Sequence, residues 1–402
     1  MALMAVARAL QHVLADAHPL PAEKIPLSDA FGRVLAEDLT ALRTQPPAAV
    51  SAMDGYAVRA ADVAATPLAL KLIGEVAAGH PFNGEVKAGQ TARIFTGGMM
   101  PKGSDTVIIQ ELATRDGDMV TFQKPAAKGR NVRDRGIDFA RGQTLLRKGH
   151  RLTDRDLMLV AGMNHPTLYV HRRPKIAVLG TGDELVAPGS KPAAGEIVYS
   201  NGFGLMALAR REGAEVSDLG IARDKVEDIA AAVRRAHNGD ADILLTSGGA
   251  SVGEHDLVQR ALSSEGLTLS FWRVAMRPGR PMMHGKLGNM QVLGVPGNPV
   301  SSYVCAFLFL VPLIRRLSGR AEVEHVPERA LLGCDLPAND ERADYLRATL
   351  CIDTNGAVAT PVPNQDSSLM APLAAADCLL IREPNAPAAS SGSWCVILKL
   401  GL

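Results

Sequence analysis

Three glycine-rich loops, each directly after an apolar, strand-like run, carry the side chains best suited to chemistry. They are the segments 180–185, 246–256 and 295–300. The third, Val-Pro-Gly-Asn-Pro-Val, is stiff because each proline fixes its own φ and restricts the residue before it. Placed before the helix-like segment Ser301–Leu317, it directs backbone N–H groups at one point near a helix N-terminus, which favours anions. An ordinary turn is the alternative for each loop taken alone.

Carboxylates and hydroxyls at the ends of these apolar runs predict one pocket that holds a phosphate and a metal ion. In open α/β sheets, ligands bind outside the carboxyl ends of the strands. Oxygen ligands suit Mg²⁺ beside phosphate, and glycine lets the backbone approach a ligand closely. A helix N-cap or a turn is the alternative role for each acid. The candidates are Gly182, Asp183, Glu184, Asp224, Thr246, Ser247, Gly248, Gly249 and Asp256.

These loops must be positioned by a sheet, and the chain predicts one between residues 174 and 319. Strand-like and helix-like segments alternate there, which is typical of a mostly parallel sheet with helices on both faces. The expected strands are Lys175–Leu179, Glu215–Ile221, Asp242–Leu245, Leu267–Trp272 and Met290–Val295. The expected helices are Asn201–Glu212, Val226–His237 and Asp256–Ser263.

The remaining segments predict a multidomain α/β protein. Residues 27–140 contain short strand-like runs between glycine, proline and aspartate, so we expect a β-rich inserted domain. Residues 320–402 return to short strands and predict a small C-terminal β-barrel-like domain. Residues 174–319 are the expected α/β domain.

Composition narrows the class of protein. The 402 residues allow two to four domains, and 47% hydrophobic with 21% charged residues is ordinary globular composition. A net charge of +1 and 4% aromatic residues argue against a nucleic-acid-binding protein. The five scattered cysteines form no Cys-x-x-Cys pair, which predicts reduced thiols in a cytoplasmic protein.

No membrane span is expected from the apolar segments. The longest apolar run, Val304–Ile314, contains Pro312 and has about eleven residues, whereas a bilayer span needs about twenty. The N-terminal segment Met1–Ala17 has apolar residues at a helical period and predicts an amphipathic helix. We therefore expect a soluble protein.

Five motifs occur in order along the chain: Ser51-Ala52-Met53-Asp54-Gly55-Tyr56-Ala57, Thr96-Gly97-Gly98, Gly182-Asp183-Glu184-Leu185, Ser247-Gly248-Gly249 and Pro296-Gly297-Asn298-Pro299. With them the sequence resembles the molybdopterin molybdotransferase (molybdenum insertase) family and is similar to the E domain of gephyrin. The first motif is the most restricted of the five. The resemblance covers the chain from its first helix to its C-terminal tail. It implies an elongated homodimer of four-domain chains. Residues 1–26 and about 141–173 would form a discontinuous N-terminal helical domain, and the β-rich module inserted into it would reach towards the partner's active site.

The resemblance also implies roles for residues that local patterns do not single out. Asp54 and Thr96 become active-site candidates, with Glu184, Asp224 and Asp256 as Mg²⁺ ligands. Arginines suit bidentate capture of phosphate or molybdate oxygens, although many relatives carry lysine at some of these positions. The implied substrate-binding residues are Arg133, Asp138, Arg273, Arg277, Arg280, Pro296, Gly297, Asn298, Pro299 and Ser367.

The implied reaction consumes adenylylated molybdopterin and molybdate, releases AMP and leaves molybdenum on the molybdopterin. The implied protein partners are a molybdopterin adenylyltransferase and acceptor molybdoenzymes. Two alternatives stay open: a non-catalytic molybdopterin-binding scaffold of the gephyrin type, and a molybdopterin adenylyltransferase. The acids at positions 54, 184, 224 and 256 favour the insertase, because a scaffold has no need for a carboxylate cluster.

Overall fold

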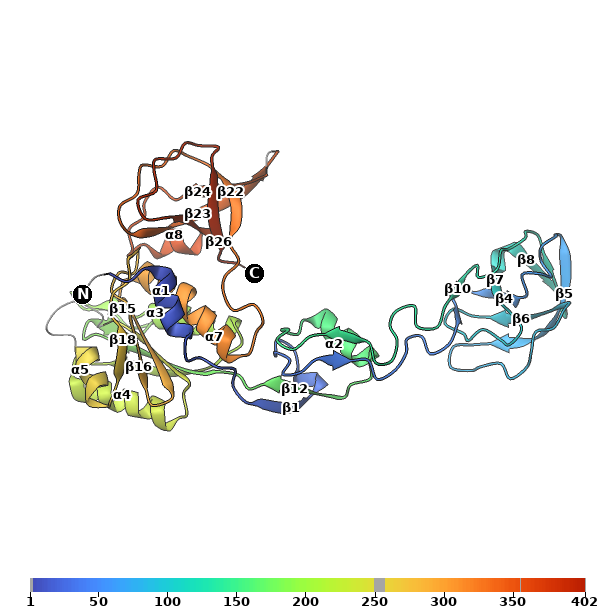
Figure 1. The fold of residues 1–402 in the computed structure, drawn as a ribbon, viewed down its shortest axis with the longest axis horizontal. Coiled ribbons are helices and arrows are strands. Elements are labelled where there is room, and N and C mark those ends of the chain that lie inside the picture. Colours follow the sequence, from blue (N-terminus) through green and yellow to red (C-terminus); the bar gives the residue numbers. More distant parts are fainter. Residues whose placement is uncertain (1–2, 249–256, 355, 402) are drawn as a thin grey trace.

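The computed structural model describes residues 3–248, 257–354 and 356–401, and every structural statement below concerns these residues. Figure 1 shows an extended molecule, with an α/β domain and a barrel at one end. A β-rich module lies at the other end, and a small module around α2 lies between them. The expected α/β multidomain class is confirmed by this arrangement and by the closed C-terminal barrel.

The α/β domain is built on a six-stranded mixed sheet. Its strands lie in the order β16 (Glu215–Ala222), β13 (Lys175–Thr181), β17 (Ile243–Ser247), β21 (Met290–Val295), β20 (Met283–Leu287) and β18 (Thr268–Phe271). The first four strands are parallel, β20 runs antiparallel to them, and β18, antiparallel to β20, runs in the direction of the first four. The carboxyl ends of β13, β17 and β21 are therefore neighbours at one edge of the sheet.

Both faces of this sheet are covered, because successive side chains of a strand point to opposite sides. Ile176 and Val178 belong to one core cluster, whereas Ala177 and Leu179 belong to another. The first core packs under α1 (Val6–Leu14), α3 (Asn201–Arg211), α6 (Pro299–Cys305) and α7 (Val311–Leu317). The second packs under α4 (Val226–Asn238) and α5 (Leu257–Ser264). This double burial explains why the strands are almost continuously apolar.

One long helix, Pro299–Leu317, leads away from the third glycine-rich loop. Its 19 residues are apolar enough to span a membrane, but 83% of the apolar window is buried inside the protein, so it is a core helix. Its middle, η3 (Ala306–Leu310), is a π-helical stretch. Pro312 lacks the N–H that would bond to the Phe307 carbonyl in a π-helix. That carbonyl accepts a hydrogen bond from His325 Nε2 at 2.7 Å instead.

The small middle module joins two distant segments of the chain. β1 (Ala22–Pro26) pairs with β12 (Thr167–His171), and β2 (Leu39–Thr40) pairs with β11 (Thr144–Leu146). The helix α2 (Asp154–Gly162) begins with a capping box between Thr153 and Asp156. The remaining element is the 3-10 turn η1 (Leu27–Asp29).

The packing of this module differs from the expected boundaries. Residues 30–41 share a core with residues 139–170, although we expected them in the β-rich insert. The N-terminal helix α1 packs through Ala9 and Val13 on the α/β domain, not with the middle module. Both differences come from pairing over more than a hundred residues, which local patterns do not encode.

The β-rich module contains a six-stranded sheet and two small cores. Its strand order is β7 (Thr106–Ile109), β4 (Gly55–Val58), β6 (Gln90–Ile94), β5 (Leu68–Val76), β9 (Met119–Phe122) and β8 (Ala113–Asp116), with the turn η2 (Gln110–Leu112). The chain enters and leaves through the paired strands β3 (Val50–Ser51) and β10 (Val132–Arg133).

The C-terminal domain is a closed five-stranded barrel, because its strands β23 and β25 also pair with each other. The barrel strands are β22 (Glu328–Leu332), β23 (Ala343–Asp353), β24 (Gly356–Pro361), β25 (Cys378–Arg382) and β26 (Trp394–Lys399). β19 (Met276–Arg277) of the α/β domain pairs with β23 and attaches the barrel. The short helix α8 (Met370–Ala374) lies between the barrel and α6.

Candidate functional site

A cavity of about 730 Å³ lies at the carboxyl ends of β13, β17 and β21, where the sequence predicted a pocket. One wall is the short parallel pair β14 (Leu185–Val186) and β15 (Ile197–Val198). The lining residues are Thr181, Glu184, Leu185, Ile197, Val198, Tyr199, Ser200, Asn201, Ser247, Gly248, Pro281, Pro296, Gly297, Asn298, Pro299, Ser368 and Met370. All three glycine-rich loops therefore contribute to one cavity.

Asn201, the first residue of α3, fastens two of these loops together. Its side-chain Nδ2 donates to Ser247 Oγ at 2.9 Å and to the Gly297 carbonyl at 2.7 Å. Ser247 Oγ also lies 3.4 Å from Ser302 Oγ on α6. Sequence reasoning missed Asn201, because a polar residue before an apolar helix is commonly a cap. It is a positioning residue that fixes the end of β17 against the Pro-Gly-Asn-Pro turn.

A loop of the C-terminal domain closes the cavity over this turn. Asn298 occupies the N-cap position of α6, but its side chain makes no capping bond. Its Nδ2 donates instead to Ser367 Oγ at 3.0 Å, and the Val300 N–H donates to the Ser367 carbonyl at 3.0 Å. The expected residue Ser367 thus touches the turn, while its neighbour Ser368 lines the cavity.

Glu184 is the acid that lines the cavity, and glycine at position 182 makes its placement possible. Gly182 has a φ of +148°, and a Cβ there would lie 2.5 Å from Glu184 Oε2. Beside it, Asp183 Oδ1 accepts a hydrogen bond from the Asp224 N–H at 3.1 Å. The structure thus brings together the loops that carry three of the expected acids. The predicted residues Gly249 and Asp256 lie outside the described residues.

One member of the expected metal triad, Asp256, lies outside the described residues. Among residues 3–248, 257–354 and 356–401, no three histidine, cysteine or acidic side chains form a metal-binding group. Glu184 and Asp224 offer only oxygen ligands, and both are exposed at strand ends, which suits a partly hydrated Mg²⁺. Magnesium binding by these residues stays a prediction.

Three buried hydroxyls near the carboxyl ends of these strands have no hydrogen-bond partner in the described part of the chain. They belong to Thr181, Tyr199 and Thr246. The Tyr199 ring packs against Gly180 and Gly202, where any larger residue would collide with it. Burial raises the pKa of Tyr199 to about 12, so its hydroxyl is neutral. An unsatisfied buried hydroxyl costs about 1–3 kcal/mol, which a polar ligand can recover.

The three predicted arginines do not line this cavity. Arg277 is bound to the barrel instead: its Nε donates to Asp344 Oδ1 at 2.8 Å, and its Nη1 lies 3.2 Å from Asp340 Oδ2. Asp344 raises the pKa of the Arg277 guanidinium, as expected for a permanent ion pair. Arg280 is exposed directly before the lining residue Pro281, and the Arg273 carbonyl pairs with the N-terminal segment.

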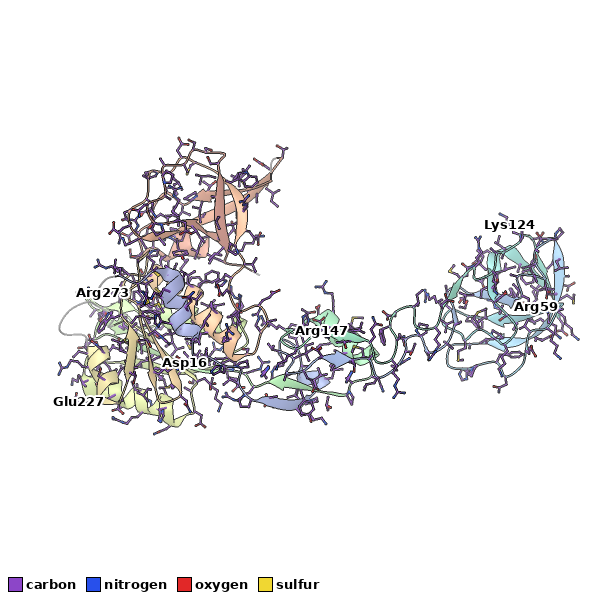
Figure 2. The ribbon with its side chains drawn as sticks, viewed as in Figure 1. Asp16, Arg59, Lys124, Arg147, Glu227 and Arg273 are labelled. Carbon is purple, nitrogen blue, oxygen red and sulfur yellow. The ribbon has the colours of Figure 1, made fainter. Side chains whose placement is uncertain are left out.

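Asp54 and Thr96 form a second, separate arrangement in the β-rich module. Asp54 Oδ1 accepts hydrogen bonds from the Thr96 N–H at 2.7 Å and the Thr96 hydroxyl at 2.8 Å. The hydrogen bond from the backbone N–H, and after it the one from the hydroxyl, lowers the pKa of the Asp54 carboxyl. Figure 2 shows Arg59 of this module and Arg273 of the α/β domain at opposite ends of the molecule. Within one chain, Asp54 and Thr96 therefore do not reach the cavity.

The other two residues predicted outside the α/β domain lie at the base of the β-rich module. Arg133 is in β10, paired with Val50. The Asp138 N–H donates to the Gln45 carbonyl at 3.1 Å, where the chain returns to the middle module. Neither of them lines the cavity.

The fold and cavity define a multidomain α/β protein with a partly polar cavity at the carboxyl edge of its sheet. Models of known families match three stretches: the MoeA N-terminal region (domain I and II) at residues 4–163, a probable molybdopterin binding domain at 177–316, and the MoeA C-terminal region (domain IV) at 329–400. Together these matches cover most of the chain.

Individual relatives agree with the family models. A molybdopterin molybdenumtransferase from Haemophilus influenzae is 35% identical, over 94% of each chain. One from Bacillus subtilis is 31% identical, over 94% of this chain and 90% of that protein. The crystal structure of a molybdopterin biosynthesis MoeA protein from Pyrococcus horikoshii OT3 superposes with a TM-score of 0.84 at 29% identity, covering 99% of this chain and 100% of that one. The chain belongs to the molybdopterin molybdenumtransferase (MoeA) family and is a transferase of molybdenum cofactor biosynthesis.

Proposed function

We propose that this chain inserts molybdenum from molybdate into adenylylated molybdopterin and releases AMP. The observation that carries the proposal is the cavity itself: Glu184, Ser247 and Gly297 line it, and Asn201 binds both Ser247 and Gly297. Hydroxyls, an amide and a carboxylate at the ends of parallel strands suit a substrate with phosphates and a polar heterocycle. The name of its relatives, molybdopterin molybdenumtransferase, supports the transfer of molybdenum to molybdopterin.

Mg²⁺ fits the acids at this edge of the sheet, since they provide oxygen ligands only. Glu184 and Asp224, with Asp256, would hold the ion. The ion would supply positive charge against the pyrophosphate oxygens. The chain's own contribution is to orient the substrate through the fastened loops and to keep Glu184 at the cavity wall through Gly182.

We further propose that two copies of the chain form the working enzyme in the cytoplasm. Asp54 is held by Thr96 in a defined geometry, yet it lies at the far end of its own chain from the cavity. A head-to-tail pair would bring this carboxylate to the partner's cavity. Molybdopterin adenylyltransferase would deliver the substrate, and acceptor molybdoenzymes would take the product.

The experiment is to incubate the purified chain with adenylylated molybdopterin and Mg²⁺, with and without molybdate, and to measure AMP by chromatography. AMP formation that depends on molybdate is the expected result. Tight substrate binding without AMP would indicate a scaffold. Formation of adenylylated molybdopterin from molybdopterin and ATP would indicate an adenylyltransferase. Either result would refute the proposal.

A further inference from the structure

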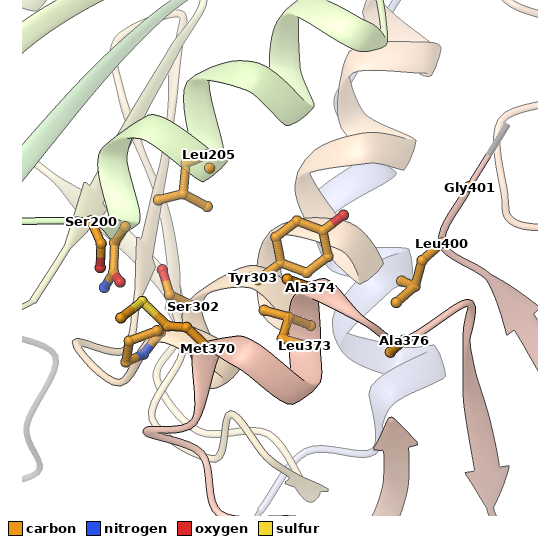
Figure 3. A pocket seen from close by; sticks show the side chains of 13 residues that line it. Ser200, Leu205, Ser302, Tyr303, Met370, Leu373, Ala374, Ala376, Leu400 and Gly401 are labelled. Carbon is orange, nitrogen blue, oxygen red and sulfur yellow. The ribbon is translucent and has the colours of Figure 1, made fainter. Parts of the chain in front are cut away.

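The described lining of the main cavity provides no positive charge of its own. None of these lining residues is a lysine, an arginine or a histidine, whereas the proposed substrate carries phosphates. A second, mostly apolar hollow of about 450 Å³ adjoins the cavity (Figure 3), and its described lining residues include no basic side chain either. Because oxyanions bind well to cationic N–H donors, a fixed cation from outside these linings would complement the site.

The β-rich module holds Arg93 in place with neutral groups. Arg93 lies directly opposite Tyr56 in the register of β6 and β4. Its guanidinium carbon is 5.0 Å from the centroid of the Tyr56 ring and 5.0 Å from that of the Phe95 ring. Its Nη2 also donates a hydrogen bond to Gln110 Oε1. Two cation–π contacts and an amide therefore fix the position of this guanidinium.

No ion pair neutralises the charge of Arg93 in the part of the chain that the structure describes. Glu75 lies beside it in the register of β5 and β6, but the two side chains form no ion pair. By contrast, Arg172 and Arg277 are each bound to an aspartate. Within the described residues, the Nε and Nη1 groups of Arg93 also have no hydrogen-bond partner. Arg93 therefore keeps its charge and two N–H positions for a ligand.

Asp54 shares this face of the sheet with Arg93. Asp54 lies two residues before Tyr56, and side chains two residues apart along a strand point to the same face. After the two hydrogen bonds from Thr96, the charge of Arg93 also lowers the pKa of Asp54, so the two groups interact. A lone carboxylate repels an oxyanion, whereas a carboxylate beside a guanidinium can lie close to one.

We propose that Arg93 binds an oxyanion of the reaction, either a phosphate of the adenylylated substrate or molybdate, in the cavity of a second copy of the chain. The inference rests on the head-to-tail pair proposed above and deepens it. Both oxyanions can accept the forked N–H donors of a guanidinium. The β-rich module then brings Asp54 together with the positive charge that the lining of the cavity lacks.

The experiment compares Arg93→Gln with the wild type in the AMP-release assay, and measures KM separately for adenylylated molybdopterin and for molybdate. At least one KM should rise roughly ten- to a hundredfold, the range for losing a hydrogen bond to a charged group. A rise for the pterin substrate alone identifies a phosphate as the ligand, and a rise for molybdate alone identifies molybdate. The matched control is Arg115→Gln, because Arg115 is exposed on β8 of the same module. Its kinetics should equal those of the wild type, and the Tm of each variant checks folding.

Mixed dimers test whether Arg93 acts on the second chain. At substrate concentrations below KM, equal amounts of Arg93→Gln and Glu184→Gln chains should recover about a quarter of wild-type activity, because each mixed pair has one intact site. Mixing Arg93→Gln with Asp54→Asn should recover none, since both changes lie on the module and leave neither site intact. Recovery in neither mixture, or in both, would overturn the assignment.

The kinetic constants separate contact with the oxyanion from support of Asp54. Unchanged KM values for both substrates in Arg93→Gln would overturn the assignment and leave the insertase function standing. This holds even if kcat falls, because Arg93 would then act only by holding Asp54. A wild-type chain that releases no AMP would refute the proposed function instead. An active wild-type monomer in light scattering would refute the proposed pair, and with it the role of Arg93 in a second cavity.

Discussion

The α/β domain and the β-rich module place their acidic residues in different surroundings. In the α/β domain, loops far apart in sequence meet in one cavity, because parallel strands end at the same edge. In the β-rich module, the Asp54 carboxylate accepts two hydrogen bonds from Thr96, 42 residues away, on an exposed surface. One region builds a cavity, and the other presents a fixed carboxylate.

This difference shows that a fixed side-chain geometry does not by itself make a functional site. Asp54 accepts two hydrogen bonds, which fix the direction of its carboxylate, but Asp54 is not among the residues that line the cavity. A reaction that involves Asp54 requires a second protein surface beside it. The predictions that follow separate the two regions, from the largest expected effect to the smallest.

Removing the cavity's acid should have the largest effect. We expect Glu184→Gln to lower molybdate-dependent AMP release at least about a hundredfold, the usual scale for losing one charge-stabilising group. Glu227→Gln is the matched control, since Glu227 is exposed in the first turn of α4 (Figure 2). Circular dichroism should show the same fold for both variants. Turnover close to wild type in Glu184→Gln would contradict the role given to this carboxylate.

Mixing two inactive variants tests whether the β-rich module acts on a partner. Equal amounts of Glu184→Gln and Asp54→Asn chains should form mixed dimers in half of all pairs. If Asp54 serves the partner's cavity, each mixed dimer has one intact site, and about a quarter of wild-type activity should return. If the module serves its own chain, mixing should restore none. Size-exclusion chromatography with light scattering would confirm the dimers.

Loosening the loops of the cavity should have a moderate effect. Asn201→Ala removes the hydrogen bonds to Ser247 and Gly297. Each bond is worth about 1 kcal/mol, so KM should rise roughly tenfold while kcat changes less. Asn238→Ala, at the exposed end of α4, is the control. Equal kinetics in the two variants would show that Asn201 does not position the loops.

The smallest effect is expected from Thr96→Val. Hydrogen bonds from the Thr96 N–H and hydroxyl hold the pKa of Asp54 below its usual value. The interaction therefore stabilises the module above the usual pKa of an aspartate, and this stabilisation is lost as pH falls through the lowered pKa. In Thr96→Val the pKa of Asp54 should rise towards its usual value, which carboxyl NMR can follow. An unchanged pKa would show that the backbone N–H alone holds the carboxylate.

Much of the α/β domain was predictable from sequence, because the patterns that specify its strands, helices and turns are local. The strand Met290–Val295 and the helix start at Asn201 coincide with the observed bounds, since apolar runs and glycine turns specify them. The three loops also meet as expected, because strand direction alone places their ends together. Glu184, Ser247 and Gly297 were therefore found by pattern.

Long-range partners were not predictable. Arg277 looks like an anion-binding residue until Asp344, 67 residues later, is seen beside it. The segment 30–41 looks like part of the β-rich module, yet it packs with residues that follow the insertion. Tyr199 and Asn201 carry no distinguishing local pattern. Register and pairing across such separations depend on the packed core as a whole.

The docking of α1 has a consequence for synthesis on the ribosome. Met4 bonds through its backbone to Arg273 and Ala275, so the first helix to be made has its partners about 270 residues later. At roughly 5–20 residues per second, that wait is on the order of tens of seconds. The β-rich module, complete by residue 133, can fold long before then. The N-terminal helix can therefore dock only late in synthesis. The α/β core is complete only when this segment, the first to be synthesised, packs onto it.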